Sequence, residues 1–308
     1  MPNQPTYNRA PALVPLVAAT ACWGAGTVVT KQVLNDVAPL TLLPMQLTAS
    51  CLLLFVFCLV RRERLVWSPP TRRLAALGVL NPGLAYALGL LGLASITASM
   101  SVLLWAAEPV LIVVFAVVLL REHVPAQLLA TLAVAVLGVL LVVYQPGASG
   151  DALGVVLTLV AVGCCALYTV ATRQLLLDDA SLPIVLAQQI AALALALLLA
   201  TAVQVAGWDG WAVRGHSWRT WAAAAASGCL YYGLAFWFYL AGLRHVRASV
   251  AGAFLPLIPV FGVAAGYLIG ERLAGRQWVG ALVVVASTAT MAFQQARVAN
   301  EESSAAST

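Results

Sequence analysis

Glu108 is the one ionisable residue that lies deep within a long apolar run of this chain, the run over residues 98–120. If the run is a membrane-spanning helix, Glu108 lies about 15 Å from its start, since an α-helix rises about 1.5 Å per residue. A carboxylate at that depth is costly unless it faces a cavity, is protonated or has a partner. Three roles are therefore open to Glu108: coupling to protons or cations, contact with a substrate amine, or a structural hydrogen bond to a neighbouring helix.

Prolines and glycines occur within the apolar runs over residues 98–120 and 248–270, at positions that favour a helix break or a close helix contact. Pro109, Pro256 and Pro259 would each free a main-chain carbonyl group and bend a helix, which makes them candidate hinges. The alternative is that they are ordinary prolines of membrane helices, where Pro is common. The helix-packing candidates recur every four residues on one helix face, and they are Gly262, Gly266 and Gly270.

Motifs for catalysis are missing from the sequence. It has no phosphate-binding glycine loop, no His–carboxylate metal cluster and no nucleophile motif. The six cysteines all fall in apolar runs and form no Cys-x-x-Cys pair. We therefore expect no catalytic residue, no metal and no cofactor. A polytopic enzyme acting on lipid is a remote alternative, because it would need clustered acidic, His or Cys groups near one membrane interface.

The composition explains why such helices are expected. Mean hydropathy is +0.95, with 62% hydrophobic and 9% charged residues, far from the usage of soluble domains. A membrane-spanning helix needs about 20 apolar residues. Ten such runs are present, at roughly 12–34, 39–60, 74–93, 98–120, 126–144, 152–175, 182–206, 219–242, 248–270 and 277–295.

The two halves of the chain are related by an internal repeat, since residues 83–110 align without a gap with residues 233–260. Identical pairs include Gly83 with Gly233, Leu90 with Leu240, Gly92 with Gly242, Ser99 with Ser249 and Pro109 with Pro259. Five spans in each half would insert the second half upside down. The expected fold is an all-α membrane protein of two inverted five-helix repeats, residues 1–145 and 150–296. In the repeat alignment Ile258 takes the place of Glu108, so the symmetry of the two halves does not require an acidic residue at this position.

The distribution of positive charge predicts the orientation. Most of the 16 Lys and Arg residues fall on the side that would hold both termini, which the positive-inside rule assigns to the cytoplasm. The net charge of +5 is then a topology signal and does not indicate a nucleic-acid partner. Residues 297–308 are small and polar and predict a disordered cytoplasmic tail. We expect a multi-pass protein of the cytoplasmic (inner) membrane, as a monomer or homodimer.

The sequence resembles the EamA-type members of the drug/metabolite transporter superfamily over nearly its full length. The shared features are Trp23-Gly24 in the first span and a mid-span Pro followed by Glu at the span end, seen as Pro109 with Glu122 and as Pro259 with Glu271. The resemblance implies ten helices and export or exchange of small metabolites or drugs. It also implies a central cavity lined mainly by the first, third, fourth, sixth, eighth and ninth spans. Members often carry Arg in the second span, where this chain has Gln46.

Aromatic side chains gather in the spans that the resemblance assigns to the cavity. With one acidic group beside them, they would suit an amphipathic or amine-bearing molecule. Helix packing is the alternative role for the same side chains. The candidates are Trp23, Tyr86, Trp105, Tyr168, Tyr232 and Phe236, with Tyr231 and Trp237 in the same spans.

These observations together predict a secondary transporter, an exporter of a small metabolite or drug that works by alternating access. Its expected partners are the lipid bilayer, a small-molecule substrate and, if Glu108 serves coupling, protons. The alternative within the same class is an uncoupled facilitator or exchanger of amino-acid-like metabolites.

Overall fold

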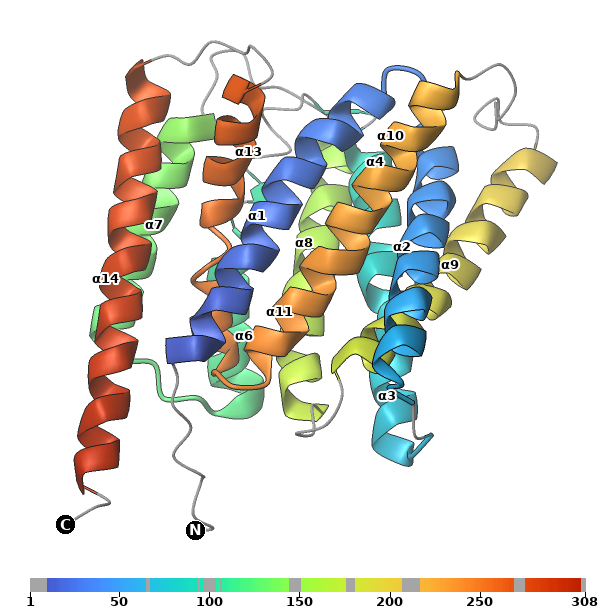
Figure 1. The fold of residues 1–308 in the computed structure, drawn as a ribbon. Helices are drawn as coiled ribbons and strands as arrows, with labels where there is room; N and C mark the ends of the chain where they lie inside the picture. Colours follow the sequence, from blue (N-terminus) through green and yellow to red (C-terminus); the bar gives the residue numbers. More distant parts are fainter. Residues whose placement is uncertain are drawn as a thin grey trace.

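The fold was obtained as a computed structural model (Figure 1). It describes residues 10–64, 67–93, 95–96, 104–105, 107–143, 151–175, 181–206, 217–268 and 275–305. Within this part, eight helical segments are long and apolar enough to cross a membrane, and two shorter apolar helices cover Glu108–Leu120 and Ala126–Val142. The multi-pass, all-helical character of the chain is thus confirmed, and the number of ten spans stays a prediction.

The helices follow one another in the same order in each half. The first half contains α1 (Ala10–Val33), α2 (Pro39–Arg61), α3 (Pro69–Gly78), η1 (Val79–Leu84), α4 (Ala85–Leu93), α6 (Glu108–Leu120) and α7 (Ala126–Val143). The second half contains α8 (Ala152–Leu175), α9 (Ser181–Val205), α10 (Trp218–Gly228), η2 (Cys229–Leu234), α11 (Ala235–Leu243), α12 (Ala248–Gly252), α13 (Leu257–Leu268) and α14 (Gly275–Ala305).

The second half is inverted relative to the first. In Figure 1, α1 rises from the lower end of the bundle, whereas its counterpart α8 descends from the upper end, and the same reversal holds for α2 with α9 and α7 with α14. The repeat extends to local geometry. The π-helical turns η1 and η2 are 150 residues apart in the chain, the same offset that relates residues 83–110 to residues 233–260. The two halves are thus one structural unit used twice.

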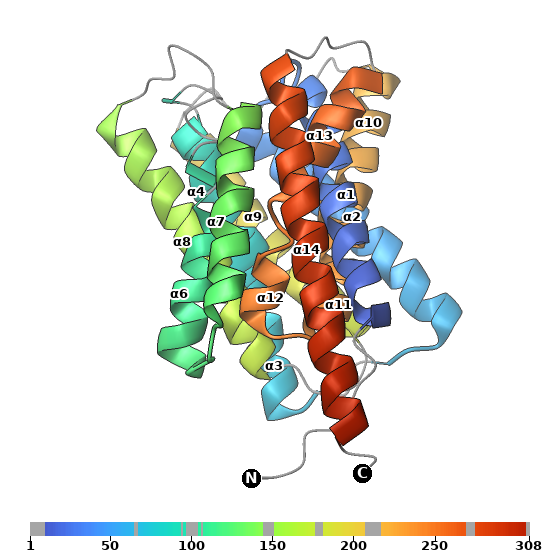
Figure 2. The same cartoon turned by 90° about the vertical axis from the view of Figure 1, so that its left-hand side faces the viewer.

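The two halves interlock, because the first helix of each half packs against helices of the other half. α1 lies against α11 and α13, and its counterpart α8 lies against α4 and α6. Two pairs of counterpart helices pack against each other: α2 with α9 at one side of the bundle, to the right in Figure 1, and α7 with α14 at the opposite side, where Figure 2 shows them in front. Small residues allow these approaches, as membrane helices require. A Cβ atom at Gly280 would lie 2.7 Å from the Gly138 carbonyl oxygen.

The third span begins earlier than the sequence suggested, at Pro69 rather than near residue 74. Ser68 is its N-cap, and its hydroxyl accepts a hydrogen bond from Thr71 N at 3.4 Å. Ser217 caps α10 in the same way, accepting from Thr220 N at 3.3 Å. Serine caps followed by Pro or Trp explain both starts, and the Ser-x-x-Thr spacing was the available signal.

The prolines begin helices and do not bend continuous ones, which corrects part of the hinge expectation. Pro109 lies in the first turn of α6, where a missing amide costs no helical hydrogen bond. Pro256 ends the turn Ala253–Pro256 between α12 and α13, and Pro259 lies in the first turn of α13. Bonds such as Leu255 N to Gly252 O, 3.0 Å, tighten that turn. The ninth span is therefore interrupted beside Pro256, and a hinge role stays a prediction.

The last helix also differs from expectation, since α14 continues to Ala305 where residues 297–308 were expected to form a disordered tail. The stretch contains Arg297, Ala299, Glu301, Glu302 and Ala305, residue types that favour helices, which accounts for the extension. Among the packing glycines, Gly266 is buried in α13 and Gly270 lies outside the described residues.

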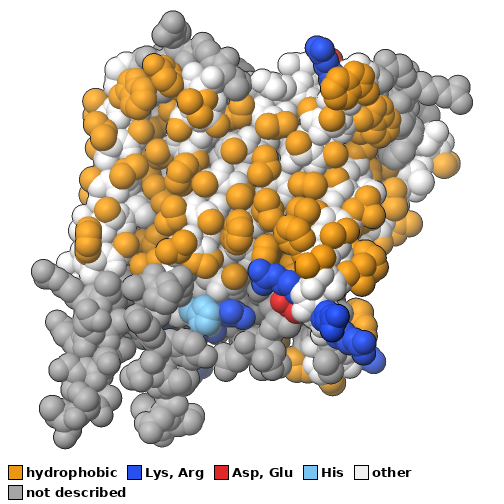
Figure 3. Space-filling model, in the orientation of Figure 1, with side chains coloured by type: hydrophobic (Ala, Val, Ile, Leu, Met, Phe, Trp, Pro, Cys, Tyr) orange, Lys and Arg blue, Asp and Glu red, His pale blue; other side chains and the backbone are white. Residues whose placement is uncertain are grey.

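The surface has the charge distribution of a membrane protein. On the face in Figure 3, hydrophobic side chains cover the middle of the molecule, and Lys, Arg and His side chains gather mostly at its lower end. Apolar residues such as Val60, Val118 and Leu268 are strongly exposed. Such exposure is expected of surfaces that face lipid and not water.

Candidate functional site

The six candidate aromatic residues come together in one cluster. Trp105 stacks on Tyr86 with ring centroids 6.1 Å apart, and Tyr86 contacts Tyr232 at 5.3 Å. Tyr232 lies parallel to Phe236 at 6.4 Å. Phe236 in turn meets Trp23 and Tyr168. The cluster draws on α1 and α4 from one half and on α8, η2 and α11 from the other, so it lies between the halves.

Burial divides the cluster into two groups. Trp23, Tyr168, Tyr232 and Phe236 are buried, with Tyr168 only 1% exposed. Tyr86, Trp105 and Tyr231 are half-buried, and they form one continuous patch because Tyr86 contacts both of the others. The buried group has the environment of a packed core. The half-buried patch is the part that a small molecule could touch.

Tyr239 belongs to the cluster and was missed in the sequence. Its ring lies 5.2 Å from Trp23, and its hydroxyl is 3.4 Å from that of Thr169. Residues three and four apart share a helix face, so the step from Phe236 to Tyr239 was the available signal. Trp237 lies elsewhere, between Phe57 and Phe238.

Glu108 lies beside the half-buried patch. It occupies the first turn of α6 and is half-buried. Its carboxyl group is near enough to act electrostatically on Cys165, Tyr231 and Tyr239. No cation lies within ion-pair distance of it among the described residues. Within the same part of the chain, no group of His, Cys, Asp and Glu could hold a metal ion.

Two buried glutamines at equivalent positions of the repeat join neighbouring helices by hydrogen bonds. Gln188 of α9 accepts a hydrogen bond from the Tyr168 hydroxyl at 2.9 Å and donates to Leu74 O at 2.9 Å. Gln46 of α2 donates to the Ser227 hydroxyl at 2.8 Å and to the Thr30 hydroxyl at 2.9 Å. Both side chains are buried and have partners, as the bilayer interior demands. Gln46 therefore has a structural role.

The Trp23-Gly24 pair places α1 against the interrupted ninth span. A Cβ atom at Gly24 would lie 2.6 Å from Gly262 N and 2.7 Å from Ile258 O. Gly24 thus lets α1 approach α13 at backbone contact. A Cβ atom at Gly262 would lie 3.6 Å from Gly24 O, an ordinary van der Waals distance, so the packing role of Gly262 stays a prediction. The buried Trp23 Nε1 has no hydrogen-bond partner among the described residues.

Glu122 joins the two halves at one end of the bundle. Its carboxylate accepts hydrogen bonds from Ala248 N at 3.0 Å and from the Ser249 hydroxyl at 2.6 Å, and so caps α12. Arg247 donates to His123 O at 2.7 Å in the same place. The contact joins the two halves through main-chain amides and a hydroxyl.

The comparisons with known proteins agree with this architecture. The sequence profile of the EamA-like transporter family matches residues 11–144 and again residues 152–293. The chain therefore belongs to the EamA-like transporter family, and the expected two-repeat organisation is confirmed. No curated protein sequence matches it significantly. A solved crystal structure has a TM-score of 0.78 and 19% identity to it, covering 94% of this chain and 98% of the other, which shows a shared fold.

Proposed function

We propose that this protein exports a small metabolite or drug by alternating access between its inverted repeats, with Glu108 as the coupling or amine-binding group. Membership of a transporter family supports transport. The observation that carries the rest is Glu108 itself, a half-buried carboxyl group in a membrane span of the first half, near enough to Tyr231 and Tyr239 of the second half to act on them electrostatically. A costly group at that depth is a functional site by default.

The substrate class follows from the half-buried patch. Tyr86, Trp105 and Tyr231 offer aromatic faces, and Glu108 offers one negative charge next to them. Aromatic faces attract cations, and a carboxylate pairs with an amine. The site thus suits a molecule with an apolar body and one protonated amine. Trp23, Tyr168, Tyr232 and Phe236 support the site by packing behind it.

Alternating access fits the way in which the halves interlock. Because α1 packs on the second half and α8 on the first, a rocking motion of one half changes contacts on both. Glu122 and Arg247 hold the halves together at the end of the bundle where α6 ends. We propose that this end is the cytoplasmic one, that it is closed in this conformation, and that it opens when the Glu122 contacts break.

The energy source is an ion gradient, because the full sequence contains no phosphate-binding motif for ATP. Protonation of Glu108 would remove the charge that holds an amine. A proton that enters the outward-open site would thereby release the substrate to that same side, and the proton would leave Glu108 when the site opens to the cytoplasm. We place the protein in the cytoplasmic membrane with both termini in the cytoplasm.

The test is uptake into proteoliposomes that hold the purified protein, with a panel of amino acids, nucleobases and cationic dyes, with and without an imposed pH gradient. We expect one or more amine-bearing compounds to accumulate with the gradient. Glu108→Gln should abolish that accumulation, while binding in detergent reports whether amine recognition is lost as well.

Glu63→Gln is the matched control, because it removes a carboxylate at the bundle end that pairs with Arg61 at 3.8 Å. It should transport as the unchanged protein does. Flux that equilibrates and ignores the gradient would make the protein a facilitator or exchanger and would overturn coupling. A Glu108→Gln variant that transports normally over a range of pH would remove Glu108 from the site.

A further inference from the structure

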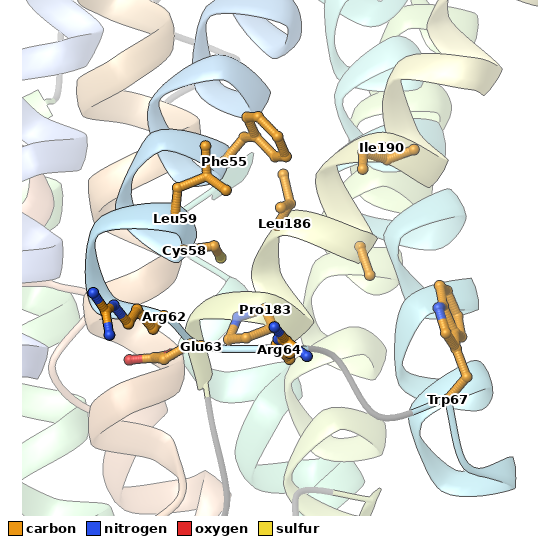
Figure 4. Close-up of a pocket in the computed structure, with 11 residues that line it drawn as sticks. Phe55, Cys58, Leu59, Arg62, Glu63, Arg64, Trp67, Pro183, Leu186 and Ile190 are labelled. Carbon is orange, nitrogen blue, oxygen red and sulfur yellow. The ribbon is translucent and has the colours of Figure 1, made fainter.

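A pocket of about 600 Å³ lies away from the aromatic cluster, on the outer side of the bundle. It is formed where α2 ends, where the chain turns toward α3, and where α9 begins (Figure 4). α2 of the first half packs against its counterpart α9 of the second half. A ligand bound here would therefore contact both halves of the protein.

One part of the pocket is apolar and faces the lipid-exposed surface. Phe55 and Leu59 of α2 form one wall, and Ile190 of α9 forms the other, each more than half exposed. Figure 4 shows these side chains on the two facing helices, above the charged residues. In a bilayer, such a wall is in contact with acyl chains.

The other part is positively charged. Arg62 and Arg64 are exposed and line the mouth, with Arg64 beside Pro183 in Figure 4. Glu63 lies between them in sequence, but its carboxylate pairs with Arg61 at 3.8 Å, and the Arg61 guanidinium lies 4.8 Å from the Trp237 ring centroid. Glu63 is the only acidic residue among the described residues that line the pocket, and it is engaged by an arginine outside the pocket, which leaves two cations at the mouth.

Trp67 sets the depth of the pocket relative to the membrane. It is 59% exposed and lies across the mouth from Arg64. Tryptophan is enriched at the level of the lipid headgroups, where its ring and its N–H meet apolar and polar surroundings. The apolar wall therefore lies at acyl-chain depth and the arginines at headgroup depth.

We propose that this pocket binds an anionic phospholipid, with its phosphate on Arg64 and Arg62 and one acyl chain along Phe55, Leu59 and Ile190. The charge at the mouth selects an anionic headgroup over a zwitterionic one, because basic pockets between membrane helices attract anionic lipids. The volume is in the range of small-molecule sites. The site is separate from Glu108 and does not depend on the transport proposal.

The test is native mass spectrometry of the full chain in detergent, titrated with phosphatidylglycerol and, separately, with phosphatidylcholine of the same acyl chains. We expect phosphatidylglycerol to bind at lower concentration. R62Q/R64Q should weaken its binding roughly tenfold or more, since each arginine near an anionic surface contributes measurably to lipid affinity.

R72Q/R73Q is the matched control, because it removes the same charge from exposed positions of α3 outside the pocket. It should bind phosphatidylglycerol as the unchanged protein does. Equal binding of the two lipids, or equal loss in both double variants, would overturn the proposal. Full displacement by millimolar inorganic phosphate would also overturn it, by showing a site for free phosphate. If R62Q/R64Q aggregates, R64Q alone gives the same comparison.

Discussion

Gly228 of the second half packs directly against the main chain of Gln46 in the first half. A Cβ atom at position 228 would lie 2.8 Å from the Gln46 carbonyl carbon, closer than real Cβ atoms approach. The inverted repeat reproduces the contact, since a Cβ atom at Gly78 would lie 2.6 Å from the Gln188 carbonyl carbon. Two backbone crossings, each between the two halves, thus join α10 to α2 and α3 to α9.

Gly228→Ala should destabilise the protein by about 1–3 kcal/mol, because the added methyl group meets main-chain atoms that have no rotamer to escape into. A lower thermal unfolding midpoint in detergent would show it. Gly163→Ala is the control, since that glycine also lies in a helix, α8, but has open space around it. An equal midpoint for both variants would mean that the crossing at Gly228 can relax.

Tyr168→Phe should also destabilise the protein, for a different reason. The variant leaves the Gln188 side-chain oxygen buried without the hydroxyl that now donates to it at 2.9 Å. A buried acceptor left unpaired costs about 1–3 kcal/mol, and no water replaces the donor within the bilayer. Tyr267→Phe, at an exposed position of α13, should keep the original midpoint. A stable Tyr168→Phe variant would show that this bond contributes little.

The sequence predicted the inverted repeat well, because residues 83–110 and 233–260 align without a gap. It placed six aromatic residues of the cluster in the candidate spans, but it missed Tyr239 and added Trp237, which lies elsewhere. It did not predict which of them are buried, since the side that α11 turns to its neighbours is set by packing against α1 of the other half. The same limit applies to Pro109 and Pro259, where the pattern showed a proline within an apolar run and could not show that a helix begins there.

The division of the aromatic cluster predicts two kinds of variant. Tyr86→Leu and Trp105→Ala alter the half-buried patch and should raise the KM for transport by about tenfold, with little change in unfolding midpoint. Phe236→Ala removes a buried ring and should lower the midpoint, because a large cavity costs about 3–5 kcal/mol. Transport kinetics and thermal unfolding measured on each variant separate the two. A raised KM with a stable fold in Phe236→Ala would place that ring in the binding surface instead.

Glu122→Ala should loosen the start of α12. The Ala248 amide and the Ser249 hydroxyl lose the carboxylate that now accepts from them, and hydrogen bonds to a charged acceptor contribute about 1.5–3 kcal/mol. Hydrogen–deuterium exchange should become roughly tenfold or more faster in a peptide that covers residues 244–252, with other helices unchanged. Glu63→Ala, which removes a carboxylate at the end of α2, should leave that peptide unchanged. Unaltered exchange in Glu122→Ala would mean that the halves are held together at this end by Arg247 and its bond to His123 O, and that Glu122 does not control its opening.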